Sequence, residues 1–267
     1  MEILYLIGMA AMLEKVQLLV SMWNYGAVYN GLGAVTGVLK RDTNAPMVYR
    51  VLAAWMMVGL QKLRIRKLES YEIVKFACNF YALYAVWLVW GFDTVILVAM
   101  VLPVTFLYDY WDWAIEIGSI GLGMTGQLDL AIVGVILLAL SRESFPLVAL
   151  AYGLVTFDGL GAGMVLFAGA GVFVLLRLVQ GEHKLYCKRF MWRDNLQSIR
   201  AIATGRVWLL SDVLVSLVIM AAGVAYVVML QPGWPVVALL VVLGFAAGRI
   251  QETRVFASIL PFVLGVL

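Results

Sequence analysis

The chain has 267 residues, of which 64% are hydrophobic and 13% are charged, and its formal net charge is +3 at pH 7. Soluble domains are about 45–50% apolar and about 25% charged, so this composition excludes an ordinary water-soluble protein. The sequence contains 1 histidine, which excludes haem, copper and di-iron centres that need several imidazoles. The small positive charge is typical of membrane topology signals and gives no basis for nucleic-acid binding.

Most of the sequence consists of continuous apolar stretches separated by short polar breaks. Only helices and closed barrels can cross a bilayer, and strands of a barrel would alternate between polar and apolar residues. The pattern therefore predicts an all-α fold, a polytopic transmembrane bundle of about nine to eleven membrane segments. Several segments are short enough to be re-entrant. No linker or soluble domain interrupts the pattern, so residues 1–267 are interpreted as a single integral membrane domain.

The first helix is predicted from about Ile3 to Met22, followed by a long polar and glycine-rich loop from Asn24 to Pro46. A second apolar segment, Met47 to Leu60, leads into the densest basic cluster of the chain. By the positive-inside rule this cluster is cytoplasmic, which places the loop on the opposite face of the membrane. The cluster comprises Lys62, Arg64, Arg66, Lys67 and Lys75.

Six further crossings are predicted before the second basic stretch, and an even number keeps both basic stretches on one side. The segment around Ile117 to Gly126 is short and interrupted by glycine, which is typical of a re-entrant helix or one that lines a cavity. The six crossings are expected at about Ile73 to Trp90, Thr94 to Leu107, Ala114 to Thr125, Leu128 to Leu140, Phe145 to Phe157 and Leu160 to Leu176.

The second basic stretch runs from Arg177 to Arg206 and is expected to contain an interfacial helix with Trp192 and Phe190 at the headgroups. After it, apolar segments are predicted from Val207 to Leu230 and from Val236 to Gly248. A polar break and a final apolar segment complete the chain.

Ionisable residues beside membrane helices are candidates for function because their burial is costly. Asp109, Asp112 and Glu116 recur at spacings of three and four residues, so on a helix they share one face. Such a cluster would raise the pKa of at least one acid or recruit a divalent cation. The alternative interpretation is an aromatic belt, formed with the neighbouring Tyr and Trp residues, in which the acids are solvated.

Four short segments, taken in order, resemble bacterial polytopic membrane proteins of the C-type (GT-C) glycosyltransferase superfamily, which use polyprenyl-phosphate sugars. The first is Pro46 to Leu52, and the second is the acidic step Tyr108-Asp109. The third is Ser141 to Ser144, between two apolar runs, and the fourth is Glu252 to Phe256, which is followed by Pro261. The resemblance extends over about Asn24 to Pro261, and it implies a GT-C-like fold.

The resemblance also implies roles for individual residues. Asp42, in the first external loop, takes the position of the acid that acts on the acceptor or binds a metal, and Asp109 and Asp112 are further candidate catalytic acids. A divalent cation would be held by Asp42 and Asp109. A guanidinium fork suits a phosphate, and three arginines are assigned to the lipid phosphate. They are Arg50, Arg142 and Arg254.

The implied function is the transfer of a sugar from a lipid-phosphate carrier at the non-cytoplasmic face, in a multi-pass protein of the bacterial inner membrane. Its partners would be membrane lipids, a polyprenyl-phosphate sugar and other membrane proteins. Two alternatives remain open. Small residues at Gly159 to Gly163 and Gly169 to Gly171 favour a non-catalytic subunit of a membrane complex, because they let helices approach closely. Glycine-interrupted helices with intramembrane acids favour a small-solute transporter.

Overall fold

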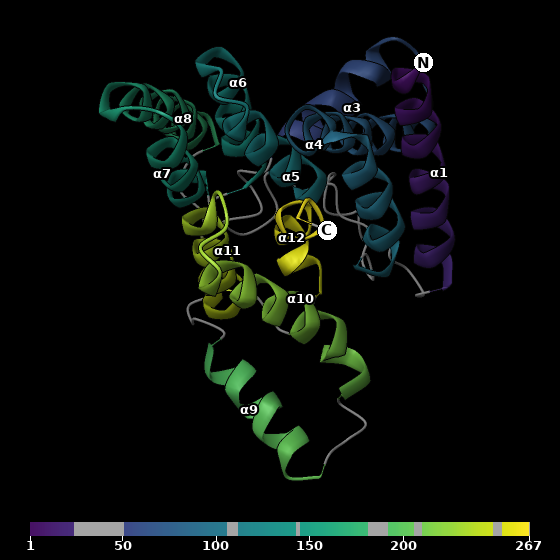
Figure 1. Cartoon of the computed structure of the whole chain (residues 1–267). Coiled ribbons are helices and arrows are strands. Elements are labelled where there is room, and N and C mark those ends of the chain that lie inside the picture. Colours follow the sequence, from purple (N-terminus) through teal and green to yellow (C-terminus); the bar gives the residue numbers. More distant parts are fainter. Residues whose placement is uncertain are drawn as a thin grey trace.

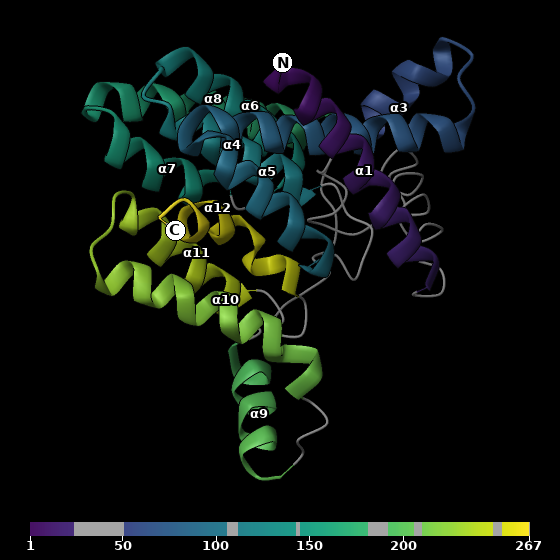
Figure 2. The same ribbon diagram turned by 45° about the vertical axis from the view of Figure 1, so that its right-hand side comes forward.

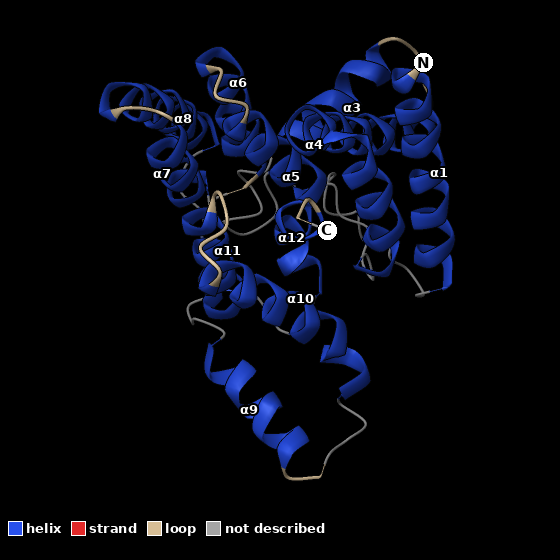
Figure 3. Ribbon diagram, viewed as in Figure 1, coloured by secondary structure: helices blue, strands red, loops and turns tan. Residues whose placement is uncertain are grey.

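The described part of the chain is entirely helical apart from short turns. A computed structural model describes residues 1–23, 51–105, 112–142, 145–180, 192–205, 210–247 and 253–266 (Figure 1). No strand occurs within these ranges (Figure 3). The all-α prediction is therefore confirmed for the described residues.

The longest element, α4 (Lys67–Thr105), is broken at Gly91. This glycine has φ of 82° and ψ of 176°, a conformation that residues with a Cβ rarely adopt. The helix before the break and the helix after it correspond to the two crossings that the sequence predicts, separated near the same position. Gly91 thus permits the helix to change direction at this position.

Helix α1 (Glu2–Trp23) packs antiparallel to the first part of α4. Near its start, Trp87 Nε1 donates to Glu2 Oε2 at 2.9 Å, and near its middle Lys15 Nζ lies 3.4 Å from Glu72 Oε2. Between these contacts, the buried residues of α1 recur at spacings of four and three, the period of one helix face. They are Leu6, Ala10 and Leu13.

Helix α3 (Leu52–Lys62) precedes α4 and contacts it. The basic residues at the junction of these two helices were expected to form one cytoplasmic cluster with Lys75. The structure separates Lys75 from that cluster, because this residue is 3% exposed within α4 and its Nζ lies 5.7 Å from the centre of the Tyr71 ring. A lysine buried on a helix contributes less to a surface charge pattern than the sequence spacing implies.

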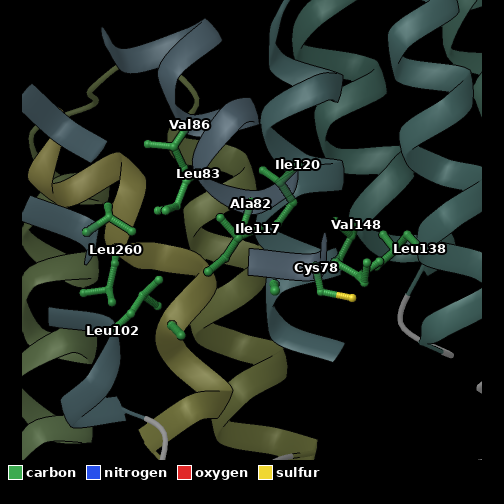
Figure 4. Packing of buried hydrophobic residues seen from close by; sticks show 14 of the residues in the cluster. Cys78, Ala82, Leu83, Val86, Leu102, Ile117, Ile120, Leu138, Val148 and Leu260 are labelled. Atoms are coloured by element: carbon green, nitrogen blue, oxygen red, sulfur yellow. The ribbon is translucent and has the colours of Figure 1, made fainter. Parts of the chain in front are cut away.

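Helix α5 (Asp112–Met124) is the central element, packed between α4, α6, α7 and the C-terminal 3-10 helix. It forms a hairpin with α6 (Leu128–Ser141), and α7 (Phe145–Thr156) and α8 (Gly159–Gln180) form the next pair. At 13 residues, α5 is about 20 Å long, too short to span a bilayer without tilting or a partner segment. Figure 4 shows Ile117 and Ile120 of α5 in a shared core with Ala82 of α4, Leu138 of α6 and Val148 of α7.

Glycines let neighbouring side chains approach the backbone of α5. A methyl group added to Gly118 would overlap the Tyr81 ring of α4, and one added to Gly123 would lie 2.5 Å from Cδ2 of Tyr152 in α7. Tyr81 also reaches Ser119, with 3.3 Å between the two hydroxyl oxygens. Gly118 and Gly123, two glycines of the predicted re-entrant segment Ile117 to Gly126, therefore accommodate tyrosine rings.

The C-terminal part forms a separate layer below the α4–α8 helices in the view of Figure 2. Helix α10 (Leu210–Val228) and α11 (Trp234–Ala247) form a hairpin, and the chain ends in η3 (Thr253–Ile259) and α12 (Leu260–Leu264). Helix α9 (Trp192–Ala203) projects away from this layer (Figures 1 and 2). These elements agree with the predicted apolar segments, except that the last one divides into a 3-10 helix and a short α-helix.

Two helices of the described chain are long and apolar enough to cross a membrane. They are Lys67–Leu102 within α4 and Gly159–Gln180, and five further apolar helices have 10–17 residues. Of the most apolar 18-residue stretch of the second helix, 22% is buried. Its remaining apolar surface faces outward, as expected of a helix in contact with lipid.

Asp158 caps the start of α8, and its removal is expected to destabilise the protein by about 1 kcal/mol. Its Oδ1 accepts a hydrogen bond of 2.7 Å from the Gly161 backbone N–H, one of the donors that a helix leaves unpaired at its N-terminus. The free energy of unfolding of Asp158→Ala should fall by this amount in a detergent-unfolding titration. Asp158→Asn, which keeps an accepting oxygen, should remain within a few tenths of a kcal/mol. Equal losses in both variants would contradict the capping role.

Candidate functional site

The candidate site is a buried carboxylate held between a guanidinium and a hydroxyl. Oε2 of Glu116 lies 2.5 Å from Nη1 of Arg142, and Oε1 accepts a hydrogen bond of 2.9 Å from the Ser258 hydroxyl. Glu116 is 4% exposed and Ser258 is 1% exposed. We call these three residues the Glu116 cluster.

Each member of the Glu116 cluster comes from a different element. Glu116 lies one turn into α5, Arg142 is the C-cap residue directly after α6, and Ser258 lies in η3. Because α5 and α6 form a hairpin, the end of α6 returns to the start of α5. The extended backbone of Arg142, with φ of −147° and ψ of 142°, stops the helix there and directs the chain toward α7.

Electrostatics explain why these groups are together. An ionised carboxylate without a partner is costly in an apolar interior, and a charge-assisted hydrogen bond together with an opposite charge offsets that cost. The side chain of Arg142 is 19% exposed, whereas that of Glu116 is 5% exposed. Within the Glu116 cluster, solvent therefore reaches part of the Arg142 side chain, whereas the Glu116 carboxylate is buried.

The structure places the sequence-predicted residues unevenly. Arg142 belongs to the Glu116 cluster. Asp112 is the first residue of α5, one helical turn before Glu116, and Arg254 is the second residue of η3, four positions before Ser258. With a rise of about 2.0 Å per residue, the backbone of Arg254 lies about 8 Å along the 3-10 axis from that of Ser258.

The remaining predicted residues lie outside the described ranges. They are Asp42, Arg50 and Asp109, so the expected cation site at Asp42 and Asp109 stays a prediction. Among the described residues, no group of three or more His, Cys, Asp or Glu side chains could hold a metal ion.

The acidic cluster of Asp109, Asp112 and Glu116 stays a prediction, because Asp109 lies outside the described residues. The spacing with Asp112 on one helix is as expected, but Glu116 faces a guanidinium. A carboxylate whose charge is balanced by Arg142 has less need of a divalent cation than three adjacent acids would have.

Sequence reasoning did not predict Ser258 or the pairing of Glu116 with Arg142. A signal was present, because each of the two charged residues borders or interrupts an apolar run that is otherwise uncharged. Charges in such positions are expected to pair with each other. Choosing the partner requires the hairpin geometry, which places residues side by side that are distant in the sequence.

The chain was compared with protein-family models, with curated proteins and with solved structures. None of them matches it. Functional assignment therefore depends on the chemistry of the Glu116 cluster and on the sequence pattern.

Proposed function

We propose that the chain is a multi-pass protein of the bacterial inner membrane that transfers a sugar from a polyprenyl-phosphate carrier at the non-cytoplasmic face. The observation that carries this proposal is the position of Arg142 in the Glu116 cluster, beside η3. The proposal is supported by Arg254 lying in η3, the element whose Ser258 bonds to the same Glu116 that Arg142 contacts.

The membrane location is supported by apolar side chains on the outside of α8. Leu160 is 75% exposed, Phe167 is 81% exposed and Leu178 is 76% exposed. Soluble monomers rarely expose a contiguous apolar surface of more than a few hundred Å², whereas lipid requires one. These three residues are separated by about two and three helical turns, so they lie along one side of α8 and form one stripe.

Phosphate recognition follows from the chemistry of arginine. A guanidinium presents donors in a planar fork that matches phosphate oxygens, and it remains charged at every relevant pH. In the Glu116 cluster, the acid and Ser258 would hold Arg142 in position while its exposed edge contacts the carrier. Arg254, at the start of η3, would contribute the second cation, and Asp112 lies at the start of α5 on the same hairpin end.

The reaction itself is assigned to Asp42. As a general base, its carboxylate would take the proton of the acceptor hydroxyl while the acceptor oxygen bonds to the anomeric carbon and the polyprenyl phosphate leaves with the bonding electrons. As a metal ligand, it would instead help to hold a divalent cation near the phosphate. Asp109 and Asp112 are the alternative acids for either role.

Asp42→Asn is expected to lower turnover by about 10²–10⁴-fold, because the amide keeps the size of the side chain and cannot accept the proton. The assay follows radiolabelled sugar leaving a polyprenyl-phosphate carrier, with purified protein in lipid nanodiscs. Asp129→Asn is the matched control, because Asp129 is an exposed acid at the opposite end of the α5–α6 hairpin. Full activity in Asp42→Asn and in Arg254→Ala would refute the assignment.

A non-catalytic subunit is the second candidate, and the surface of α8 favours it. Within the described structure, nothing lies within 4 Å of a methyl group added to Gly159, Gly163 or Gly171. Small residues on an open face let a helix of another protein approach closely. Absence of sugar transfer by the unmodified protein, together with co-purification of a membrane protein through this face, would favour the subunit.

A further inference from the structure

Helix α9 differs from the other described helices in its distribution of polar and apolar residues. Its apolar side chains gather on one side and its charged side chains lie outside that side, whereas the neighbouring α10 and α11 are predominantly apolar. In Figures 1 and 2, α9 stands away from the packed body. A helix of this kind is suited to a boundary between an apolar and an aqueous phase.

The first turn of α9 attaches it to the end of α11. Asn195 is 2% exposed, and its Nδ2 donates a hydrogen bond of 2.7 Å to the backbone carbonyl of Phe245. Phe245 lies in the last turn of α11, where carbonyls have no partner within their own helix. This bond fixes α9 at the end of the body where α11 terminates.

The two faces of α9 follow from about 100° of rotation per residue. Trp192, Leu196, Ile199, Ile202 and Ala203 fall on one side, together with Asn195. Ile199 and Ile202 are partly buried against the hydrophobic core, whereas Trp192 is 41% exposed and Ala203 at the other end of the helix is also exposed.

The cations of α9 lie along the border between its two faces. Arg193 and Arg200 are both exposed. They are seven residues, or about two turns, apart and therefore lie along the same edge of the apolar side, whereas Asp194 lies on the polar side. The guanidinium of Arg193 lies 5.2 Å from the centre of the Trp192 ring, so the border joins an aromatic ring to a cation. Arginines at such a border reach outward while their stems cover apolar surface.

The surrounding sequence has the same sign of charge. Between residues 177 and 206 there are seven Lys and Arg residues and two Asp and Glu residues. The occupant complementary to an apolar stripe bordered by cations is a layer of anionic lipid headgroups over acyl chains. A polar protein surface would match the charge and leave the apolar stripe exposed to water.

We infer that α9 lies in the headgroup region of the membrane and binds anionic lipid through Arg193 and Arg200, with Trp192 and Leu196 directed toward the acyl chains. This inference is independent of the sugar-transfer proposal, because a subunit or a transporter would hold α9 in the same way.

The test measures the immersion of α9 in the complete protein in nanodiscs. Cys78 and Cys187 are replaced by alanine, and one nitroxide label is placed at Ala203 on the apolar side or at Gln197 on the polar side, both of which are exposed. Accessibility to oxygen and to a water-soluble nickel complex is compared in phosphatidylcholine and in phosphatidylcholine with about 30% phosphatidylglycerol.

The label at Ala203 is expected to be accessible to oxygen and protected from nickel, and the label at Gln197 is expected to show the reverse. Phosphatidylglycerol should increase the protection at Ala203 at least twofold, and Arg193→Gln/Arg200→Gln should abolish that increase. The control Arg64→Gln/Arg66→Gln removes two exposed arginines elsewhere and should preserve it. Nickel access at both positions in both lipids would overturn the inference. Protection at Ala203 from both reagents, without a lipid effect, would also overturn it by indicating a protein partner.

Discussion

Arg142→Gln is expected to reduce the free energy of unfolding by about 3–5 kcal/mol, because it leaves the carboxylate of Glu116 buried without its cation. Oε2 of Glu116 lies 2.5 Å from Arg142 Nη1, and among the described residues Ser258 would remain to stabilise a group that is 4% exposed. Equilibrium unfolding in mixed detergent micelles, followed by far-UV circular dichroism, measures the loss. A loss below about 1 kcal/mol would indicate that the pair is solvated.

The double variant Glu116→Gln/Arg142→Met separates the ion pair from simple packing. Replacing both members of a buried pair with uncharged groups of similar size is often neutral or stabilising, so this variant should be more stable than Arg142→Gln alone. It should also lack sugar transfer if Arg142 contacts the carrier phosphate. A folded double variant with normal transfer would limit the Glu116 cluster to a structural role.

Gly118→Ala is expected to destabilise the protein by about 1–3 kcal/mol, because the added methyl group overlaps the Tyr81 ring. Alanine is intrinsically better than glycine in a helix by about 1 kcal/mol, so a net loss would identify the steric conflict as the larger effect. Thermal unfolding midpoints of the variants in the same detergent provide the comparison.

Gly163→Ala in α8 is the matched control. In the described structure nothing lies within 4 Å of the added methyl group, so this variant should be neutral or more stable by up to about 1 kcal/mol. In a Tyr81→Leu background, which removes the ring, the cost of Gly118→Ala should fall. Equal effects at the two glycines would contradict the packing described for α5.

Helix boundaries were predictable where apolar runs end at polar or turn-forming residues. The predicted segments Leu128 to Leu140 and Phe145 to Phe157 differ by one residue from α6 and α7. The division of α4 was also predicted, because Gly91 and Asp93 interrupt its apolar run. Helix ends and the break at Gly91 depend on residues close to them in the sequence, so they can be predicted from the sequence itself.

The partners of each helix were not predictable in the same way. Within the described residues, Gly159 and Gly163 have no neighbour within 4 Å of an added methyl group, whereas Gly118 and Gly123 accommodate tyrosine rings. A glycine has the same local pattern whether its face meets a ring or lipid. The site shows the same limit, because the spacing groups Glu116 with two acids, whereas the pairing with Arg142, which follows α6, depends on the fold.

The bend at Gly91 also bears on the order in which the protein assembles during synthesis. On one side of the bend Trp87 bonds to Glu2, and on the other the Phe92 ring lies 6.1 Å from that of Tyr5, so both contacts come from the first turns of the chain. All these residues are synthesised before α5. The change of direction can therefore be set by contacts among residues that precede α5, and Phe262, whose ring lies 5.0 Å from Trp90, packs later onto a bend already in place.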